Sequence, residues 1–91
     1  MEDDIKRQAN NMCSQMSLDE CILYMNKEVE KVQNGGGGTG WARNAYYAAL
    51  KERFQGFEID TSSFIIDVHG HITMSFAKKI HLLEGKIIQI D

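Results

Sequence analysis

The 91-residue sequence contains no proline, a single tryptophan and only two cysteines, and each scarcity narrows what the protein is expected to be. Without proline, the chain relies on glycine, asparagine, aspartate and serine to end its helices and to form its turns. Cys13 and Cys21 both fall in helix-like sequence that no secretion signal precedes. This context favours reduced thiols in the core, with a single disulfide as the alternative.

Long hydrophobic runs are also absent, because no segment approaches the ~18 apolar residues that a membrane-spanning helix needs. The acidic opening Met1-Glu2-Asp3-Asp4 is unlike a secretory signal. A formal net charge of −3 argues against a general nucleic-acid binder, whose positive field attracts phosphates. We therefore expect a cytoplasmic protein with no membrane association.

The length excludes most large catalytic scaffolds, since barrel enzymes and doubly wound nucleotide enzymes need on the order of 200 residues. We expect a single small domain over residues 1–91. Helical periodicity predicts helices at about 2–14, 17–34 and 41–55. Ser17-Leu18-Asp19-Glu20 is a capping box that begins the second helix. Gly35 and Gly56 are expected to end the second and third helices, and Thr39 to cap the third.

After Gly56 the apolar period changes from about 3.6 to 2, which predicts strands at about 63–69, 71–77, 79–83 and 86–90. His69-Gly70 and Glu84-Gly85 are turn sequences, but two-residue loops would place Val68 opposite His71. We therefore expect three-residue loops that pair apolar residues, namely Val68 with Ile72, Ile66 with Met74, Phe64 with Phe76, Leu82 with Ile88 and Ile80 with Ile90.

The order of these elements predicts a two-layer α+β fold, with two to three N-terminal helices packed on one face of a C-terminal antiparallel β-meander of two hairpins. The predicted register places Ile65, Leu83 and Ile87 on the other face of the sheet. These residues are either scattered surface apolar residues or one small contact patch.

Five glycines at positions 35–38 and 40 are the largest departure from average composition. Their spacing satisfies both GxxxxG and GxGxxG, but Trp41-Ala42 replaces the lysine and hydroxyl of a Walker loop. The loop also follows a helix instead of the strand that a dinucleotide fingerprint requires. Two interpretations stay open: a flexible connection between helices, or backbone amides that cradle a phosphate at a helix N-terminus.

Asp67-Val68-His69-Gly70-His71 resembles the D-x-H-x-H metal motif of amidohydrolase and polymerase-and-histidinol-phosphatase barrels. That resemblance implies a barrel of at least about twice this length, with further ligands on later strands. Only His81 follows in this chain, so its length excludes the family. A smaller zinc site formed by the three histidines is the enzymatic alternative to our preferred interpretation, in which they lie in turns and on the surface.

The leading hypothesis is a small non-enzymatic binding protein, without cofactor or metal, that docks on a protein partner as an inhibitor or regulator. The hypothesis includes a protein encoded by a phage or another mobile element, such as an anti-defence protein. The alternative is a small-molecule binder that captures a nucleotide or phosphorylated ligand at the glycine loop, with aromatic rings stacked on a base. Trp41 is either a core anchor of its helix or a contact residue. Both hypotheses use the same candidate residues: Gly36, Gly37, Gly38, Thr39, Gly40, Trp41, Arg43, Tyr46 and Tyr47.

Overall fold

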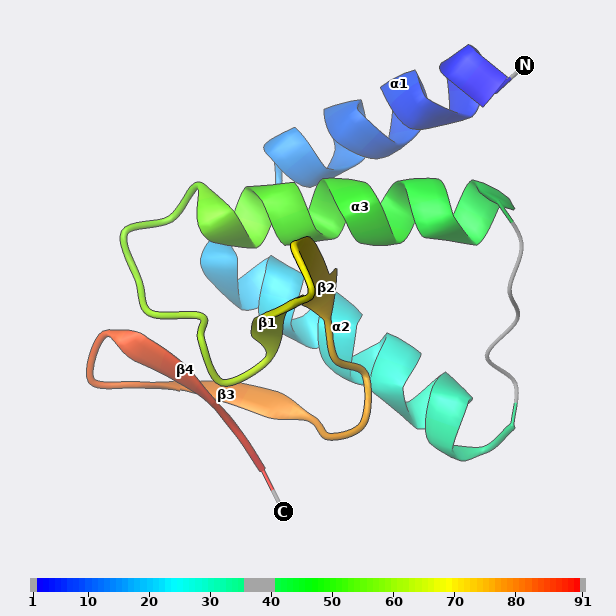
Figure 1. Cartoon of the computed structure of the whole chain (residues 1–91). Coiled ribbons are helices and arrows are strands. Elements are labelled where there is room, and N and C mark those ends of the chain that lie inside the picture. Colours follow the sequence, from blue (N-terminus) through cyan, green and yellow to red (C-terminus); the bar gives the residue numbers. More distant parts are fainter. Residues whose placement is uncertain (1, 36–40, 91) are drawn as a thin grey trace.

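The computed structural model describes residues 2–35 and 41–90, apart from the side chains of Glu2, Asp3, Trp41 and Ala42, and within them it contains three helices followed by four strands. The helices pack on two hairpins in one α+β globule (Figure 1), which confirms the predicted fold class and order of elements. The helices are α1 (Glu2–Ser14), α2 (Leu18–Gln33) and α3 (Trp41–Gln55), and the strands are β1 (Ile65–Val68), β2 (His71–Met74), β3 (Ile80–Leu83) and β4 (Lys86–Gln89).

The predicted capping box begins α2. The Ser17 hydroxyl accepts a hydrogen bond from the Glu20 amide at 3.2 Å, and the Glu20 carboxylate accepts one from the Ser17 amide at 3.0 Å. The bond from the Ser17 backbone is the main cause that holds the pKa of the Glu20 carboxyl below its ordinary value. At the other end of α2, Gly35 has a φ of +77°, the left-handed conformation that was expected to close this helix.

Replacing Ser17 with alanine is expected to lower the free energy of unfolding by about 1 kcal/mol, because the Glu20 amide loses its acceptor. Urea denaturation followed by circular dichroism measures this change. Ser14→Ala is the control, since the Ser14 hydroxyl bonds the Asn11 carbonyl at 3.0 Å near the end of α1 and caps no helix N-terminus. Equal effects of the two substitutions would contradict the capping role.

Both hairpins have two-residue loops, so the predicted three-residue loops are wrong. In hairpin 1 (β1 and β2), Val68 lies opposite His71. His69 and Gly70 between them have φ values of 53° and 84°, and the Glu84-Gly85 loop of hairpin 2 (β3 and β4) repeats this geometry with 49° and 79°. Positive φ at both central residues is typical of type I′ turns, whose twist matches that of the flanking strands. The geometry of the turns therefore sets the register of both hairpins, even though this register does not pair the apolar residues with one another.

This register moves apolar side chains to faces other than those predicted, because a shift of one residue turns every side chain over. Ile87, expected on the outer side, is buried with Ile80, and Ile65 packs against the core. Ile66 and Val68, expected in the core, are exposed. The predicted partners are replaced throughout, with Val68 opposite His71, Ile66 opposite Thr73, Leu82 opposite Ile87 and Ile80 opposite Gln89.

The four strands form two separate two-stranded sheets instead of one continuous meander. Hairpin 2 is held on both edges by other parts of the chain. The Asn26 amide donates to the Ile80 carbonyl at 3.0 Å and accepts from the Ile80 amide at 2.8 Å. On the opposite edge, Ile87 donates its amide to the Asp60 carbonyl at 2.8 Å, and Asp60 donates to the Gly85 carbonyl at 3.3 Å.

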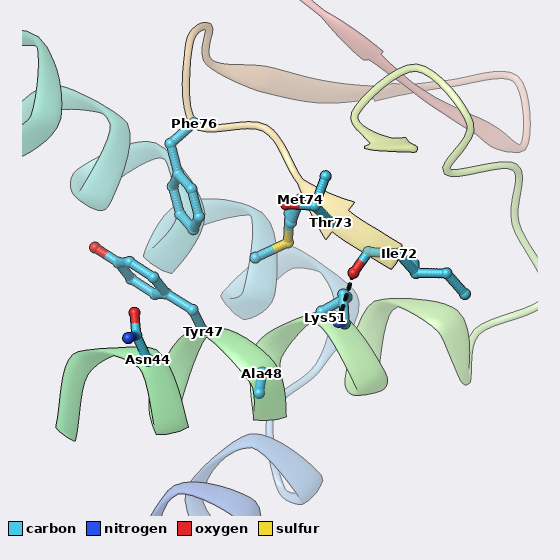
Figure 2. A pocket seen from close by; sticks show the side chains of 8 residues that line it. All are labelled: Asn44, Tyr47, Ala48, Lys51, Ile72, Thr73, Met74 and Phe76. Carbon is cyan, nitrogen blue, oxygen red and sulfur yellow. Dashed lines mark hydrogen bonds between the residues drawn. The ribbon is translucent and has the colours of Figure 1, made fainter. Parts of the chain in front are cut away.

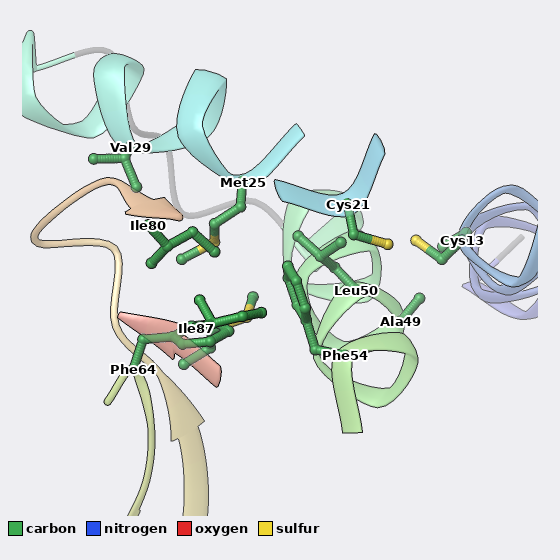
Figure 3. Packing of buried hydrophobic residues seen from close by; sticks show 12 residues of the cluster. Cys13, Cys21, Met25, Val29, Ala49, Leu50, Phe54, Phe64, Ile80 and Ile87 are labelled. Atoms are coloured by element: carbon green, nitrogen blue, oxygen red, sulfur yellow. The ribbon is translucent and has the colours of Figure 1, made fainter. Parts of the chain in front are cut away.

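The core lies between α3, α2 and the hairpins (Figure 3), while α1 lies along α3 on the side away from the hairpins (Figure 1). Phe54 of α3 and Phe64, just before β1, are fully buried and meet edge to face, with ring centroids 5.1 Å apart and an interplanar angle of 84°. The other buried apolar residues are Ala9, Cys13, Cys21, Met25, Val29, Ala49, Leu50, Met74, Ile80 and Ile87.

Both cysteines are free and buried, as the sequence predicted. Figure 3 shows the Cys13 and Cys21 sulfurs pointing toward each other from α1 and α2. Burial is the main cause that raises the pKa of the Cys21 thiol to about 11, and it also raises the pKa of Cys13. Both side chains are therefore protonated near neutral pH and act as core residues, since the thiolate is the nucleophilic form.

Candidate functional site: hairpin 1 and the groove beside α3

The predicted site is only partly covered by the structure. Positions 36–40 lie outside the described residues, and so does the side chain of Trp41, so both interpretations of the glycine segment and of Trp41 stay predictions. Arg43, Tyr46 and Tyr47 are half-buried in the first half of α3. Tyr46 packs against the edge of the hydrophobic core.

Tyr47 ties α3 to α2 and to the segment after β2. Its ring lies against Phe76, with centroids 4.3 Å apart and an interplanar angle of 34°. Its hydroxyl donates to Glu28 Oε1 at 3.3 Å, and the buried Glu28 carboxylate is paired with Lys31 at 3.0 Å. Burial, followed by the charge of Glu28, raises the pKa of Tyr47. Tyr47 therefore holds α3 against α2 and against the segment after β2. It also lines the groove described in the next paragraph.

A groove of about 300 Å³ lies between α3 and β2, next to Tyr47 (Figure 2). One wall is a single face of α3, where spacings of three, four and seven residues bring side chains together. At one end the Lys51 Nζ donates to the Ile72 carbonyl at 2.9 Å and thereby bridges helix and strand. The lining residues are Asn44, Tyr47, Ala48 and Lys51 from α3, and Ile72, Thr73, Met74 and Phe76 from β2 and the segment after it.

Hairpin 1 presents one face on which every residue is exposed, here called the outer face. It consists of Ile66 and Val68 from β1 and their cross-strand neighbours Thr73 and His71 from β2, all four of which are exposed. Ile66 is 44% exposed and Val68 is 45% exposed. Ile72, on the opposite face of the hairpin, is 51% exposed. The sequence missed this surface because the three-residue loops that it favoured would have turned these residues inward.

The D-x-H-x-H pattern builds the tip of hairpin 1. The Asp67 carboxylate accepts a hydrogen bond from the Gly70 amide at 2.8 Å, and His69 occupies the left-handed first position of the turn. Asp67 therefore caps the turn, as short acidic side chains often do. Across residues 2–35 and 41–90 the structure brings together no group of three histidine, cysteine, aspartate or glutamate side chains that could hold a metal ion.

Comparison with known proteins finds no match to this chain among protein-family models, curated proteins or solved structures. None of the described helices combines the length and the apolar character that crossing a membrane requires. Function is therefore inferred from two features of the described residues, the outer face of hairpin 1 and the groove that adjoins it. Thr73 belongs to both, so the two surfaces are continuous.

Proposed function

We propose that the chain is a non-enzymatic binding protein that docks on a protein partner through the outer face of hairpin 1 and acts as an inhibitor or regulator. The observation that supports this proposal is the exposure of Ile66 and Val68 on one face, at 44% and 45%. Single exposed apolar residues are normal on protein surfaces. Here two lie together, and Ile72, which lies opposite Asp67 on the other face of the same hairpin, is exposed as well.

The hairpin itself would gain from a partner. Hairpin 1 is a sheet of only two strands that packs on the core through Ile65 and Met74, so a partner on its exposed face would add contacts on the side where it has fewest. Burial of a fully exposed Val or Ile side chain contributes about 1.5–3 kcal/mol, so covering Ile66 and Val68, which are 44% and 45% exposed, would contribute roughly half of that for each and would stabilise both the complex and the hairpin. Polar His71 and Thr73 flank the apolar pair, in keeping with the apolar centre and polar rim of protein interfaces.

The protein would inhibit or regulate its partner if the outer face of hairpin 1 covered a functional site on that partner. A small domain is large enough to do so. We place the action in the cytoplasm, where the free Cys13 and Cys21 thiols stay reduced. The net charge of −3 supports a protein over a nucleic acid as the partner.

The double substitution Ile66→Thr with Val68→Thr is expected to weaken partner binding by about tenfold or more, because it removes apolar contact area at the centre of the interface. Threonine keeps the high strand propensity of these positions, so the free energy of unfolding should change by less than about 1 kcal/mol. The partner is first identified by native co-purification from cells that make the protein, and its affinity for each variant is then measured by calorimetric titration.

The matched control is Leu23→Gln with Val32→Gln, which removes two α2 side chains that are 57% and 41% exposed. This control variant should bind the partner as tightly as the unmodified protein. Equal affinities for the outer-face variant and the control variant would refute docking through hairpin 1.

A further inference from the structure

One side of α2 presents an exposed leucine between two opposite charges. Leu23 is 57% exposed, the largest fraction among the exposed large hydrophobic side chains of the described residues. Glu20 and Lys27 lie on the same side of the helix, because they stand three positions before Leu23 and four positions after it. We infer that this surface binds a second copy of the chain, with the two α2 helices antiparallel about a two-fold axis near Leu23. The inference goes beyond the proposed function and uses no residue of the outer face.

Leu23 borders a recess of about 320 Å³ between α2 and the end of α1. The two helices diverge from their short connection, as Figure 1 shows. Met12 is 36% exposed, whereas Met16 and Tyr24 are half-buried and pack against the core. The recess is therefore largely apolar, and its thioethers can adapt to the shape of an inserted side chain. The lining residues, here called the α2 patch, are Met12, Met16, Glu20, Leu23, Tyr24 and Lys27.

The α2 members of this patch have the spacing of a hole for a side chain of a facing helix. They stand at positions i, i+3, i+4 and i+7, and are Glu20, Leu23, Tyr24 and Lys27. In knobs-into-holes packing, a side chain of one helix inserts into a hole formed by four residues of the other. The centre of this hole lies between positions 23 and 24, so a facing α2 of the same sequence can insert its own Leu23 there. Each copy would thus supply both the knob and the hole.

The charges at the two ends of the hole favour an antiparallel second copy. In a two-fold pair, residue i contacts residue j and j contacts i, so the surface must be complementary to itself. Positions 20 and 27 are equally far from the centre of the hole. Antiparallel packing therefore brings Glu20 of each copy beside Lys27 of the other, whereas parallel packing would place each charge beside its like.

Both charges are available for a second copy. Within the described part of the chain, Lys27 forms no ion pair. Glu20 accepts the Ser17 amide through Oε1, and its Oε2 has no hydrogen-bond partner among the described residues. Exposed ion pairs contribute little to affinity by themselves. Burial of Leu23 therefore supplies most of the binding energy, and the charges set the orientation of the two helices.

Sedimentation equilibrium of the unmodified protein tests the inference first. A small interface is expected to be weak. The average mass should rise from one chain to a plateau of two chains between about 5 μM and about 500 μM protein, a range that brackets a micromolar dissociation constant. A monomer at every concentration overturns the inference. Masses that keep rising beyond two chains also overturn it, because a two-fold interface closes at the dimer.

Leu23→Gln should weaken the dimer about tenfold or more, because it removes the apolar side chain at the centre of the interface. Val32→Gln is the matched control. Val32 is 41% exposed on the same helix, but it lies about two and a half turns further on and so faces away from Leu23. The control should dimerise like the unmodified protein. Equal effects of the two substitutions, or no effect of Leu23→Gln, would overturn the inference.

An exchange of charges tests the antiparallel arrangement. Lys27→Glu and Glu20→Lys should each weaken self-association about tenfold, because each places like charges together at both ends of the interface. An equimolar mixture of the two variants should form heterodimers, since opposite charges meet again, and the absence of this rescue refutes the arrangement. Circular dichroism checks that both variants fold. Lys86→Glu, which reverses an exposed charge on hairpin 2, should dimerise normally.

The α2 patch and the outer face share no residue, so the dimer and the proposed function fail separately. The outer-face variant, Ile66→Thr with Val68→Thr, should dimerise like the unmodified protein. If the protein is monomeric while this variant still loses the partner, only the dimer is wrong. If the dimer forms while this variant keeps full partner affinity, only docking through hairpin 1 is wrong. A crosslinking group at position 23 would join two copies of the chain, a product that its mass distinguishes from a partner adduct.

Discussion

Replacing Phe64 with alanine is expected to lower the free energy of unfolding by about 3–5 kcal/mol, a large share of the total stability of a small domain. Phe64 is fully buried and its ring meets that of Phe54 edge to face, so the substitution leaves a cavity and also removes a favourable aromatic contact. It lies just before β1, and Figure 3 shows it beside Ile87 of hairpin 2. Urea denaturation monitored by circular dichroism measures the loss.

Phe57→Ala is the matched control for this substitution. Phe57 is half-buried and its ring carries the Arg53 guanidinium 4.5 Å from the centroid, so truncation there opens no closed cavity. Its effect should be well below that of Phe64→Ala. A loss at Phe64 of less than about 1 kcal/mol, or equal losses at the two positions, would show that Phe64 is not central to the core.

The substitution Asn26→Leu is expected to cost about 2–3 kcal/mol, because it removes two hydrogen bonds and leaves the Ile80 amide and carbonyl without partners at a half-buried site. These two bonds join α2 to the edge of β3. Besides lowering the free energy of unfolding in urea, the substitution should accelerate hydrogen exchange of the Ile80 amide more than that of core amides in α3.

Gln33→Leu provides the comparison, since the Gln33 side chain makes one exposed bond, to the Ala77 carbonyl at 3.2 Å. Its cost should stay below about 0.5 kcal/mol, as is usual for exposed positions. If Asn26→Leu costs no more than Gln33→Leu, Asn26 does not hold hairpin 2 in place.

The features that could be predicted from sequence are those set by neighbouring residues. The 3.6-residue period located the three helices within one residue of their observed ends. The capping box at Ser17 and the left-handed Gly35 formed as expected, because each depends on contacts within a few positions. Burial of both cysteines followed from their places on the apolar faces of helices.

The strand register could not be predicted because two local signals disagreed. His69-Gly70 favoured a two-residue turn, while the pairing of Val68 with Ile72 favoured a longer loop. In the structure the turn geometry decides, and apolar residues near the tip of hairpin 1 stay in contact with solvent. The conflict between turn and hydrophobic pattern thus coincides with the proposed docking surface, where local rules are expected to fail.

The groove was beyond sequence reasoning because its two walls come from distant segments. Lys51 and Ile72 are 21 positions apart, and Tyr47 reaches Glu28 across 19 positions. Periodicity placed Tyr47 on a helix beside the glycine segment, but its contacts with Glu28 and Phe76 depend on how α3 packs against α2 and hairpin 1. The helical spacing of Asn44, Ala48 and Lys51 indicated that these residues share one face of α3. It did not indicate that β2 forms the opposite wall of the groove.

Site-specific photo-crosslinking in cells that make the protein tests the outer face most directly. Benzoylphenylalanine replaces Val68 on the outer face in one variant and the exposed Leu23 of α2 in another. We predict one discrete protein adduct from position 68, which disappears when Ile66→Thr is added, and no such adduct from position 23. The absence of an adduct at position 68, or the same adduct from both positions, would contradict docking through hairpin 1.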